Sequence, residues 1–212
     1  MTTRKPIVRL SMTLFAAVAL TGATGCASRP PIGGAASRAP ASHPSVATLI
    51  EGVRPGDRVL LVFGAVDCPI ANAYAPELAA LFACVSELGW RMLYVYADPH
   101  LDEASVTEHR RAFGLEMPFC IDRDHRLVTA VGATVTPEVA LVQVGPDAAQ
   151  ASAVPFELLY AGRIDDRYPE RGVRRPQPTV RDLREAIEAT AAGRPVAVLR
   201  TPAVGCLIEP LR

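Results

Sequence analysis

The strongest structural signal in this chain is the stretch Val59-Leu60-Leu61-Val62-Phe63-Gly64-Ala65-Val66-Asp67-Cys68-Pro69-Ile70. Its first five residues are continuously apolar, which predicts a strand buried on both faces. A short turn that contains Gly64 follows, and apolar residues at helical spacing then run from Ala71 to Leu88. The pattern predicts a strand that turns directly into a helix, with Cys68 at the start of that helix.

A cysteine at this place has an unusual electrostatic environment. The first turn of a helix has unpaired backbone N–H groups, and that end of the helix dipole favours an anion. Both effects lower the pKa of the Cys68 thiol and favour a nucleophilic thiolate, whereas the adjacent carboxylate of Asp67 raises it. The alternative is a small, inert core cysteine, the most common fate of a free thiol.

The N-terminus has the pattern of a secretory signal. A positive start precedes a short apolar run: Arg4, Lys5 and Arg9, then Leu10 to Leu20. This run is too short for a membrane-spanning helix, which needs about 20 apolar residues. We therefore expect residues 1–25 to be a signal peptide.

The end of this segment, Ala23-Thr24-Gly25-Cys26, resembles a bacterial lipobox, in which the cysteine is lipidated and becomes the mature N-terminus. The resemblance implies a protein anchored through Cys26 on the periplasmic side of a membrane. The outer membrane is favoured because the next two residues, Ala27 and Ser28, are not acidic. Ordinary signal cleavage stays open, because Ala23 stands where a lipobox usually has leucine.

Composition predicts one folded domain behind this signal. Residues 26–44 are rich in Pro, Gly, Ala and Ser and predict a flexible tether, which leaves residues 45–212 as the domain with its C-terminal tail. The 212 residues include 22 Lys and Arg and 22 Asp and Glu, so the charge balance gives no support for nucleic-acid binding.

Alternating patterns predict an α/β domain. The expected strands are 58–63, 91–96, 119–121, 139–144 and 156–160. We expect helices at 45–53, 71–88 and 124–131. Two more are indicated by their first residues. One begins at the capping box of Ser105 and Glu108 and ends at Phe113, and the last is capped by Thr179, with Asp182 three residues on. Pro76 should kink the second helix or begin a new segment. The last two strands, which flank residues 145–155, predict an antiparallel edge to a mixed sheet.

The order of these elements, with Cys68 after the first core strand and Thr136-Pro137 before a later one, resembles the thioredoxin-fold superfamily. The segments around residues 108–114, 118–122 and 136–138 are similar to its redoxin branch, the alkyl hydroperoxide reductase/thiol-specific antioxidant (AhpC/TSA) group and related exported thiol–disulfide oxidoreductases. Three further stretches resemble exported bacterial redoxin-like proteins: residues 67–77, 162–168 and 203–206.

This resemblance implies a central mixed sheet flanked by helices and a cis-proline at Pro137 beside a catalytic Cys68. It also implies that Pro69, Thr136 and Pro137 position an incoming substrate. No cofactor is implied. The expected partners are protein thiols and disulfides or a peroxide, with an external thiol as reductant.

Two departures from the family pattern limit this expectation. Position 71 is alanine, so the C-x-x-C dithiol of a thioredoxin is absent, and Cys206 is left either as a resolving partner for Cys68 or as a structural tail cysteine. Position 65 is alanine where peroxiredoxins carry a threonine or serine, which argues against peroxidase chemistry. Cys84 and Cys120 are expected to be packed in the interior.

Other polar residues near the site favour simpler interpretations. His100 and His109 suggest a metal site, but copper-handling relatives of this fold use a second cysteine where this chain has Asn72, and we expect no metal. The run from Arg163 to Tyr168 is expected to be a solvated ion-pair network. Its alternative role is to supply positive charge from Arg163 or Arg167 to the site or a partner.

The sequence therefore predicts an exported thiol–disulfide oxidoreductase that uses Cys68 as its nucleophile. A thiol peroxidase and a non-catalytic binding module on the same fold remain as alternatives.

Overall fold

The computed structural model describes residues 52–146 and 156–211. The predicted signal peptide 1–25, the lipidation site Cys26, the tether 26–44 and all but the end of the predicted helix 45–53 lie outside the described residues, as does most of the connecting loop 145–155. No helix in the described ranges is long and apolar enough to cross a membrane.

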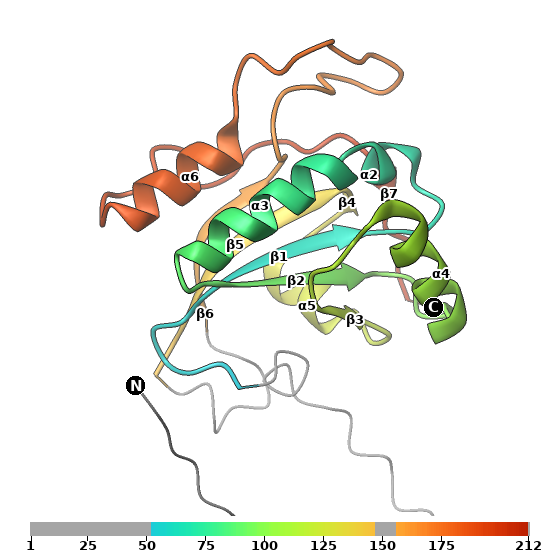
Figure 1. The fold of residues 1–212 in the computed structure, drawn as a ribbon, viewed down its shortest axis with the longest axis horizontal. Helices are drawn as coiled ribbons and strands as arrows, with labels where there is room; N and C mark the ends of the chain where they lie inside the picture. Colours follow the sequence, from blue (N-terminus) through green and yellow to red (C-terminus); the bar gives the residue numbers. More distant parts are fainter. Residues whose placement is uncertain (1–51, 147–155, 212) are drawn as a thin grey trace, which may run out of the picture. The chain divides into compact units, whose positions relative to one another are not determined.

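A five-stranded mixed sheet forms the centre of the domain (Figure 1). Its strands are β1 (Arg58–Gly64), β2 (Arg91–Tyr96), β3 (Phe119–Ile121), β5 (Glu138–Val144) and β6 (Phe156–Gly162). They lie in the order β3-β2-β1-β5-β6, with β1, β2 and β3 parallel and with β5 antiparallel to both β1 and β6. All five predicted strands and the antiparallel edge are confirmed, and the arrangement is that of the thioredoxin fold.

Helices cover both faces of this sheet. They are α2 (Pro69–Ala73), α3 (Ala75–Glu87), α4 (Glu103–Phe113), α5 (Arg126–Val131) and α6 (Asp182–Ala191). Leu60 and Val62 of β1 belong to the core that includes α3, α4 and α6, whereas Leu61 and Phe63 pack in the core that includes α5. Side chains alternate along a strand, so the continuous apolar run of β1 is buried on both faces, as predicted.

The predicted helix 71–88 is broken into α2 and α3 at Tyr74. Pro76 lies in the first turn of α3, where its missing N–H removes no helical hydrogen bond. The Tyr74 N–H closes α2 on Ala71 O at 3.1 Å, and Tyr74 O accepts the first bond of α3 from Leu78 N at 2.9 Å. The sequence-based expectation of a new segment at Pro76 is therefore confirmed.

Two predicted helix caps are wrong. The N-cap of α4 is Asp102, whose carboxylate accepts from Ser105 N at 2.7 Å, so Ser105 lies inside the first turn. Thr179 does not cap α6, because its N–H donates to Asp166 Oδ1 at 2.7 Å. The N-cap residue of α6 is Arg181, no side chain caps this helix, and the Thr179 hydroxyl instead donates to Asp166.

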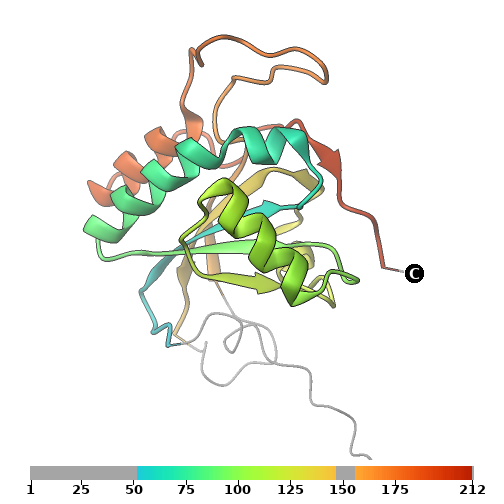
Figure 2. The same cartoon turned by 45° about the vertical axis from the view of Figure 1, so that its right-hand side comes forward.

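The C-terminal tail pairs with the domain at two places, the edge strand β6 of the sheet and a short separate strand. Arg200 bridges Ala161 at the edge of β6, with Thr201 N donating to Ala161 O at 3.0 Å. The tail then forms β7 (Cys206–Leu207), which pairs antiparallel with the short β4 (Val135–Thr136). Figures 1 and 2 both show β7 beside α2, at the end of β1. The tail therefore returns to the place where the first strand turns into a helix.

Candidate functional site

Cys68 lies where β1 turns into α2, as the sequence predicts. It is the N-cap residue of α2, and its sulfur accepts a hydrogen bond from Ala71 N at 3.4 Å. Pro69 begins the helix with the backbone angle that this position favours. A backbone donor is thus directed at the sulfur, which stabilises a thiolate.

Thr136 and Pro137 lie directly against this cysteine. The Thr136–Pro137 peptide bond is cis, as the resemblance implied, and the Cys68 thiol donates to Thr136 O at 2.9 Å. Thr136 Oγ1 is buried and pairs with no other described group, so its hydrogen is available to the Cys68 sulfur. Thr136 can therefore accept from a Cys68 thiol through its carbonyl and donate to a Cys68 thiolate through its hydroxyl.

The conformation of this loop is held by Glu138, a residue that the sequence analysis did not select. Its carboxylate is buried, and Oε2 accepts from Thr134 N at 2.8 Å. Val135 N donates to the same oxygen at 3.4 Å. Two backbone donors just before the cis bond are thus satisfied by the side chain just after it.

Cys206 lies opposite Thr136 in the β4–β7 ladder, which brings it to Cys68. Gly205 allows this approach, because a Cβ at that position would lie 2.0 Å from Thr136 O. Ile208 N donates to Thr134 O at 3.0 Å and holds the tail after the cysteine. Of the two alternatives left by the sequence, the structure has Cys206 beside Cys68, with both thiols free.

The hydrogen bonds shift the pKa values of the two thiols in opposite directions. Burial raises the pKa of Cys68, but hydrogen bonds from the Cys206 thiol, the Thr136 hydroxyl and backbone N–H groups outweigh burial and lower it. Burial, the hydrogen bond to Cys68 and the negative charges of Cys68 and Asp67 raise the pKa of Cys206 to about 11, although Arg171 opposes them. Of the two thiols, Cys68 therefore loses its proton first, and the proton that remains is held on Cys206.

The charges near the two thiols differ from the expectation. The sequence suggested that Asp67 would raise the pKa of Cys68, yet its charge acts on Cys206. The positive charge near the pair comes from Arg171 and not from Arg163 or Arg167. Arg171 lies in the long loop after β6, so only the folded structure reveals its position.

The tail covers the Cys68 sulfur. Cys68 is 0% exposed, whereas Cys206 is partly exposed and lines two hollows. One is a cavity of about 730 Å³ between the tail and the loop after β2, lined by Ala65, Asp67, Ala97 to His100, Thr136 and residues 206–211. The other, of about 400 Å³, is lined by Pro69, Ile70, Arg171 and residues 205–207.

A chain of hydrogen bonds fixes the turn before Cys68. Tyr96 Oη meets His109 Nδ1 at 2.8 Å, His109 Nε2 meets Asn72 Oδ1 at 2.8 Å, and Asn72 Nδ2 donates to Val66 O at 3.0 Å. The Asn72 oxygen can only accept, so Nε2 carries the hydrogen of a neutral His109. Burial lowers the pKa of His109, which favours this neutral form.

His109 is therefore a structural link and uses both ring nitrogens inside the protein. His100 instead lines the cavity beside Cys206. Within residues 52–146 and 156–211, no three His, Cys, Asp or Glu side chains are grouped to hold a metal ion.

The charged run after β6 is not a solvated network, so that prediction is wrong. Asp165 and Asp166 are 3% and 4% exposed. Asp165 Oδ1 accepts from the Tyr74 hydroxyl, and Asp166 accepts from Arg175. The contact with Tyr74 ties the loop after β6 to the α2–α3 break, and the contact with Arg175 lies within the loop.

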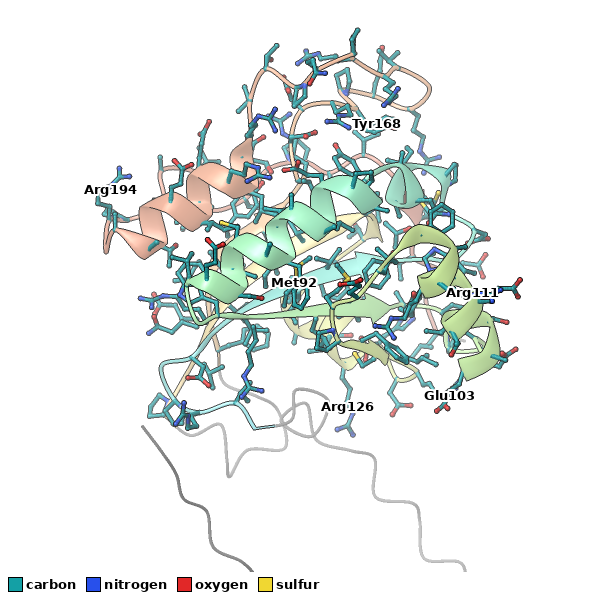
Figure 3. The ribbon with its side chains drawn as sticks, in the orientation of Figure 1. Met92, Glu103, Arg111, Arg126, Tyr168 and Arg194 are labelled. Atoms are coloured by element: carbon teal, nitrogen blue, oxygen red, sulfur yellow. The ribbon has the colours of Figure 1, made fainter. Side chains whose placement is uncertain are left out.

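The two arginines of this run are also engaged within the loop region. Arg163 forms a paired contact with Asp182, with N···O distances of 2.7 and 3.1 Å. The Arg167 guanidinium lies over the Tyr74 ring, 5.6 Å from its centroid. Tyr168, labelled in Figure 3, is 5.6 Å from the same ring between centroids. The run positions the loop that carries Arg171.

The remaining described cysteines are packed, as expected. Cys84 is partly buried against the core, and Cys120 is buried in β3. Burial and the charge of Asp122 raise the pKa of Cys120 to about 12. The environment of Cys120 therefore disfavours a thiolate, in contrast to that of Cys68.

The chain matches no protein-family model and no curated protein. Among solved structures, a hypothetical protein from Sinorhizobium meliloti is 24% identical over 74% of this chain and 81% of that chain, with a TM-score of 0.57. An uncharacterized conserved protein from Geobacillus kaustophilus is 21% identical over 75% of this chain and 80% of that chain, with a TM-score of 0.60.

A secreted disulfide oxidoreductase from Mycobacterium tuberculosis is more distant. It is 17% identical over 49% of this chain and 69% of that chain, and its TM-score of 0.37 is too low to support an argument about function. The two nearer likenesses concern the architecture alone. The thioredoxin fold itself is recognised from the sheet order and the cis Thr136–Pro137 bond.

Proposed function

We propose that this protein is a thiol–disulfide oxidoreductase in which Cys68 and Cys206 alternate between a dithiol and a disulfide. The observation that carries the proposal is the β4–β7 register, which pairs Thr136 with Cys206 beside the Cys68 sulfur. Two adjacent thiols, of which Cys68 is favoured as the thiolate, have the chemistry that disulfide exchange needs. On this view Cys206 takes the place of the second cysteine of a C-x-x-C motif.

The reaction transfers two electrons. A partner disulfide takes them from the protein dithiol and becomes a partner dithiol, while a bond forms between Cys68 and Cys206. The reverse reaction oxidises a partner dithiol. Both directions need a thiolate, and Ala71 N and Thr136 stabilise one at Cys68.

The peroxidase alternative has less support. Ala65 lines the cavity without offering a hydroxyl to a peroxide, and the tail covers the sulfur that would attack it. The proposed partners are therefore thiols and disulfides. The setting that we propose is extracytoplasmic, with the domain held to a membrane through Cys26, and it rests on the N-terminal sequence pattern.

Mapping the disulfides of the full chain tests this function. The protein is equilibrated in mixtures of reduced and oxidised dithiothreitol, quenched with acid and alkylated, and its peptides are analysed by mass spectrometry. We expect a Cys68–Cys206 link that forms and disappears reversibly, with Cys84 and Cys120 alkylated throughout. A Cys84→Ser variant should keep the link and a Cys206→Ser variant should lose it. If wild-type protein forms no such link in any mixture, the proposed function is wrong.

A further inference from the structure

The two sulfurs of the proposed redox pair differ in their access to solvent. Cys68 is 0% exposed and lines neither hollow, whereas Cys206 is partly exposed and lines both. In this fold the cysteine at the start of the helix is expected to be the one that reacts with the substrate. Here the tail lies between that cysteine and any partner.

The tail also occupies the backbone edge next to the site. An exposed strand edge offers N–H and C=O groups to which an extended peptide can add as a further strand. At β4 this edge is taken by β7, with Thr136 opposite Cys206 and Ile208 N bonded to Thr134 O at 3.0 Å. An extended polypeptide therefore cannot pair there while the tail is in place.

We propose that Cys206, and not Cys68, is the sulfur that exchanges with the partner, and that a compact thiol reaches it from the cavity of about 730 Å³. This inference rests on the proposed function and reverses the order in which the two cysteines act. The cavity has room beside Cys206, and its lining includes Thr136 and the loop Ala97 to His100.

The proposed thiol–disulfide exchange takes place in two steps. In the first step a partner thiolate attacks Cys206 Sγ of the Cys68–Cys206 disulfide; a mixed disulfide forms on Cys206, and Cys68 leaves as a thiolate. In the second step another partner thiolate attacks the partner sulfur of the mixed disulfide, and Cys206 leaves with the electron pair and takes up a proton. The partner thiols are oxidised to a disulfide and the protein pair is reduced.

The surroundings of each sulfur fit this order. Exchange is faster when the departing sulfur is the more stable thiolate. Cys68 has that property, because Ala71 N and the Thr136 hydroxyl are directed at it. In the reverse direction Cys206 attacks a partner disulfide, and its proton passes to the Cys68 thiolate to which it is hydrogen bonded.

Trapping the mixed disulfide tests the order. The oxidised full chain is mixed with 2-mercaptoethanol, quenched with acid at short times and alkylated, and the adduct is located by peptide mass spectrometry. We expect the mercaptoethanol adduct on Cys206 and the alkyl group on Cys68, in at least about tenfold excess over the opposite pattern. An adduct mainly on Cys68 would overturn the inference.

A glycine variant tests whether the tail sets this order. Gly205→Ala places a methyl group against Thr136 O, so the tail must move away from Cys68. The share of adduct on Cys68 should then rise several-fold. Gly193→Ala controls for backbone strain away from the site, since Gly193 has φ +66° and its Cβ would meet no atom within 4 Å. It should leave the adduct pattern unchanged. An unchanged pattern in Gly205→Ala would contradict the role of the tail.

The same samples separate this inference from the proposed function. If the oxidised protein contains no Cys68–Cys206 link before the thiol is added, the proposed function fails. If the link is present and the adduct maps to Cys68, only the order of the two cysteines is wrong.

Discussion

The start of α2 and the middle of β3 each bury a cysteine, yet the two thiols are affected in opposite ways. Burial raises the pKa of Cys120 to about 12 with help from Asp122. At Cys68 burial also acts to raise the pKa, but hydrogen bonds to the sulfur reverse the result. The difference teaches that donors directed at a buried sulfur, rather than its exposure, determine whether it is a thiolate.

The backbone explains why donors are present at one place and absent at the other. Cys120 lies within a strand paired with β2, opposite Val95. Backbone donors in a sheet ladder bond to the neighbouring strand. Cys68 caps a helix, where the N–H of Ala71 has no helical acceptor and bonds to the sulfur. The tail and the cis-proline loop add side-chain donors.

The largest expected effect follows from removing the Cys206 donor. Cys206→Ala should raise the Cys68 pKa by about 1 to 2 pH units, because a hydrogen bond to a charged group contributes about 1.5–3 kcal/mol. The ultraviolet absorbance of the thiolate, followed against pH and corrected with Cys68→Ala, measures the shift. Cys206→Ser keeps a donor and should show a smaller change. An unaltered Cys68 titration in Cys206→Ala would mean that Cys206 does not stabilise the thiolate.

The second prediction compares serine at the two buried positions. Cys120→Ser buries a hydroxyl in an apolar strand and should lower the free energy of unfolding by about 1–3 kcal/mol. Cys68→Ser should cost less, because Ala71 N and Thr136 O can bond to the new hydroxyl and serine is a favoured N-cap. Urea unfolding measures both. Equal losses of unfolding free energy in Cys120→Ser and Cys68→Ser would contradict this prediction.

The third prediction concerns the support beneath the Cys68 turn. The folded protein holds His109 neutral with its pKa lowered by burial, so the unfolded chain binds the proton more readily. The free energy of unfolding should therefore fall as the pH drops below about 6.5, by about 1 kcal/mol for one pH unit.

Urea unfolding on both sides of this pH checks the third prediction. His109→Gln should lose the pH dependence, and His100→Gln, an exposed control, should keep it. If His109→Gln retains the full dependence, another group is responsible for it.

The smallest expected effect is that of the Thr136 hydroxyl. Thr136→Val keeps the carbonyl that accepts from Cys68 but removes the hydroxyl, and it should raise the Cys68 pKa by about half a pH unit. Thr136→Ser restores the donor and should restore the titration. The same thiolate absorbance measures both, and a fall in the pKa in Thr136→Val would contradict the role given to the hydroxyl.

Local patterns explain why most of the fold could be predicted. The apolar run 59–63, the break at Pro76 and the strand 91–96 each depend on neighbouring residues, and all are confirmed. The two wrong caps involve hydroxyl residues that are themselves bonded to an aspartate, Ser105 to Asp102 and Thr179 to Asp166. Asp102 lies three residues before Ser105, so its role as the cap could have been predicted from the sequence. Asp166 is brought to Thr179 by the fold of the loop after β6, which the sequence does not indicate.

The site was harder to predict because its second half is distant in sequence. No residue near Cys68 in the sequence indicates that Cys206 lies beside it in the fold. The one local signal is Gly205, because a residue without a side chain is needed where the tail packs against Thr136. The link from His109 through Asn72 was missed, because His109 was considered only as a possible metal ligand and Asn72 only as the residue in place of a second cysteine. Burial of Asp165 and Asp166 depends on the loop fold and has no local signature.

The separation of Cys68 and Cys206 along the chain has a thermodynamic consequence. A C-x-x-C disulfide encloses only a few residues and restricts the unfolded chain very little. A bond between Cys68 and Cys206 would enclose nearly the whole sheet, and the entropy lost by the unfolded chain grows with the length enclosed. The redox potential of such a pair and the resistance of the domain to unfolding would be coupled, so that each electron pair accepted by the protein would also loosen its fold.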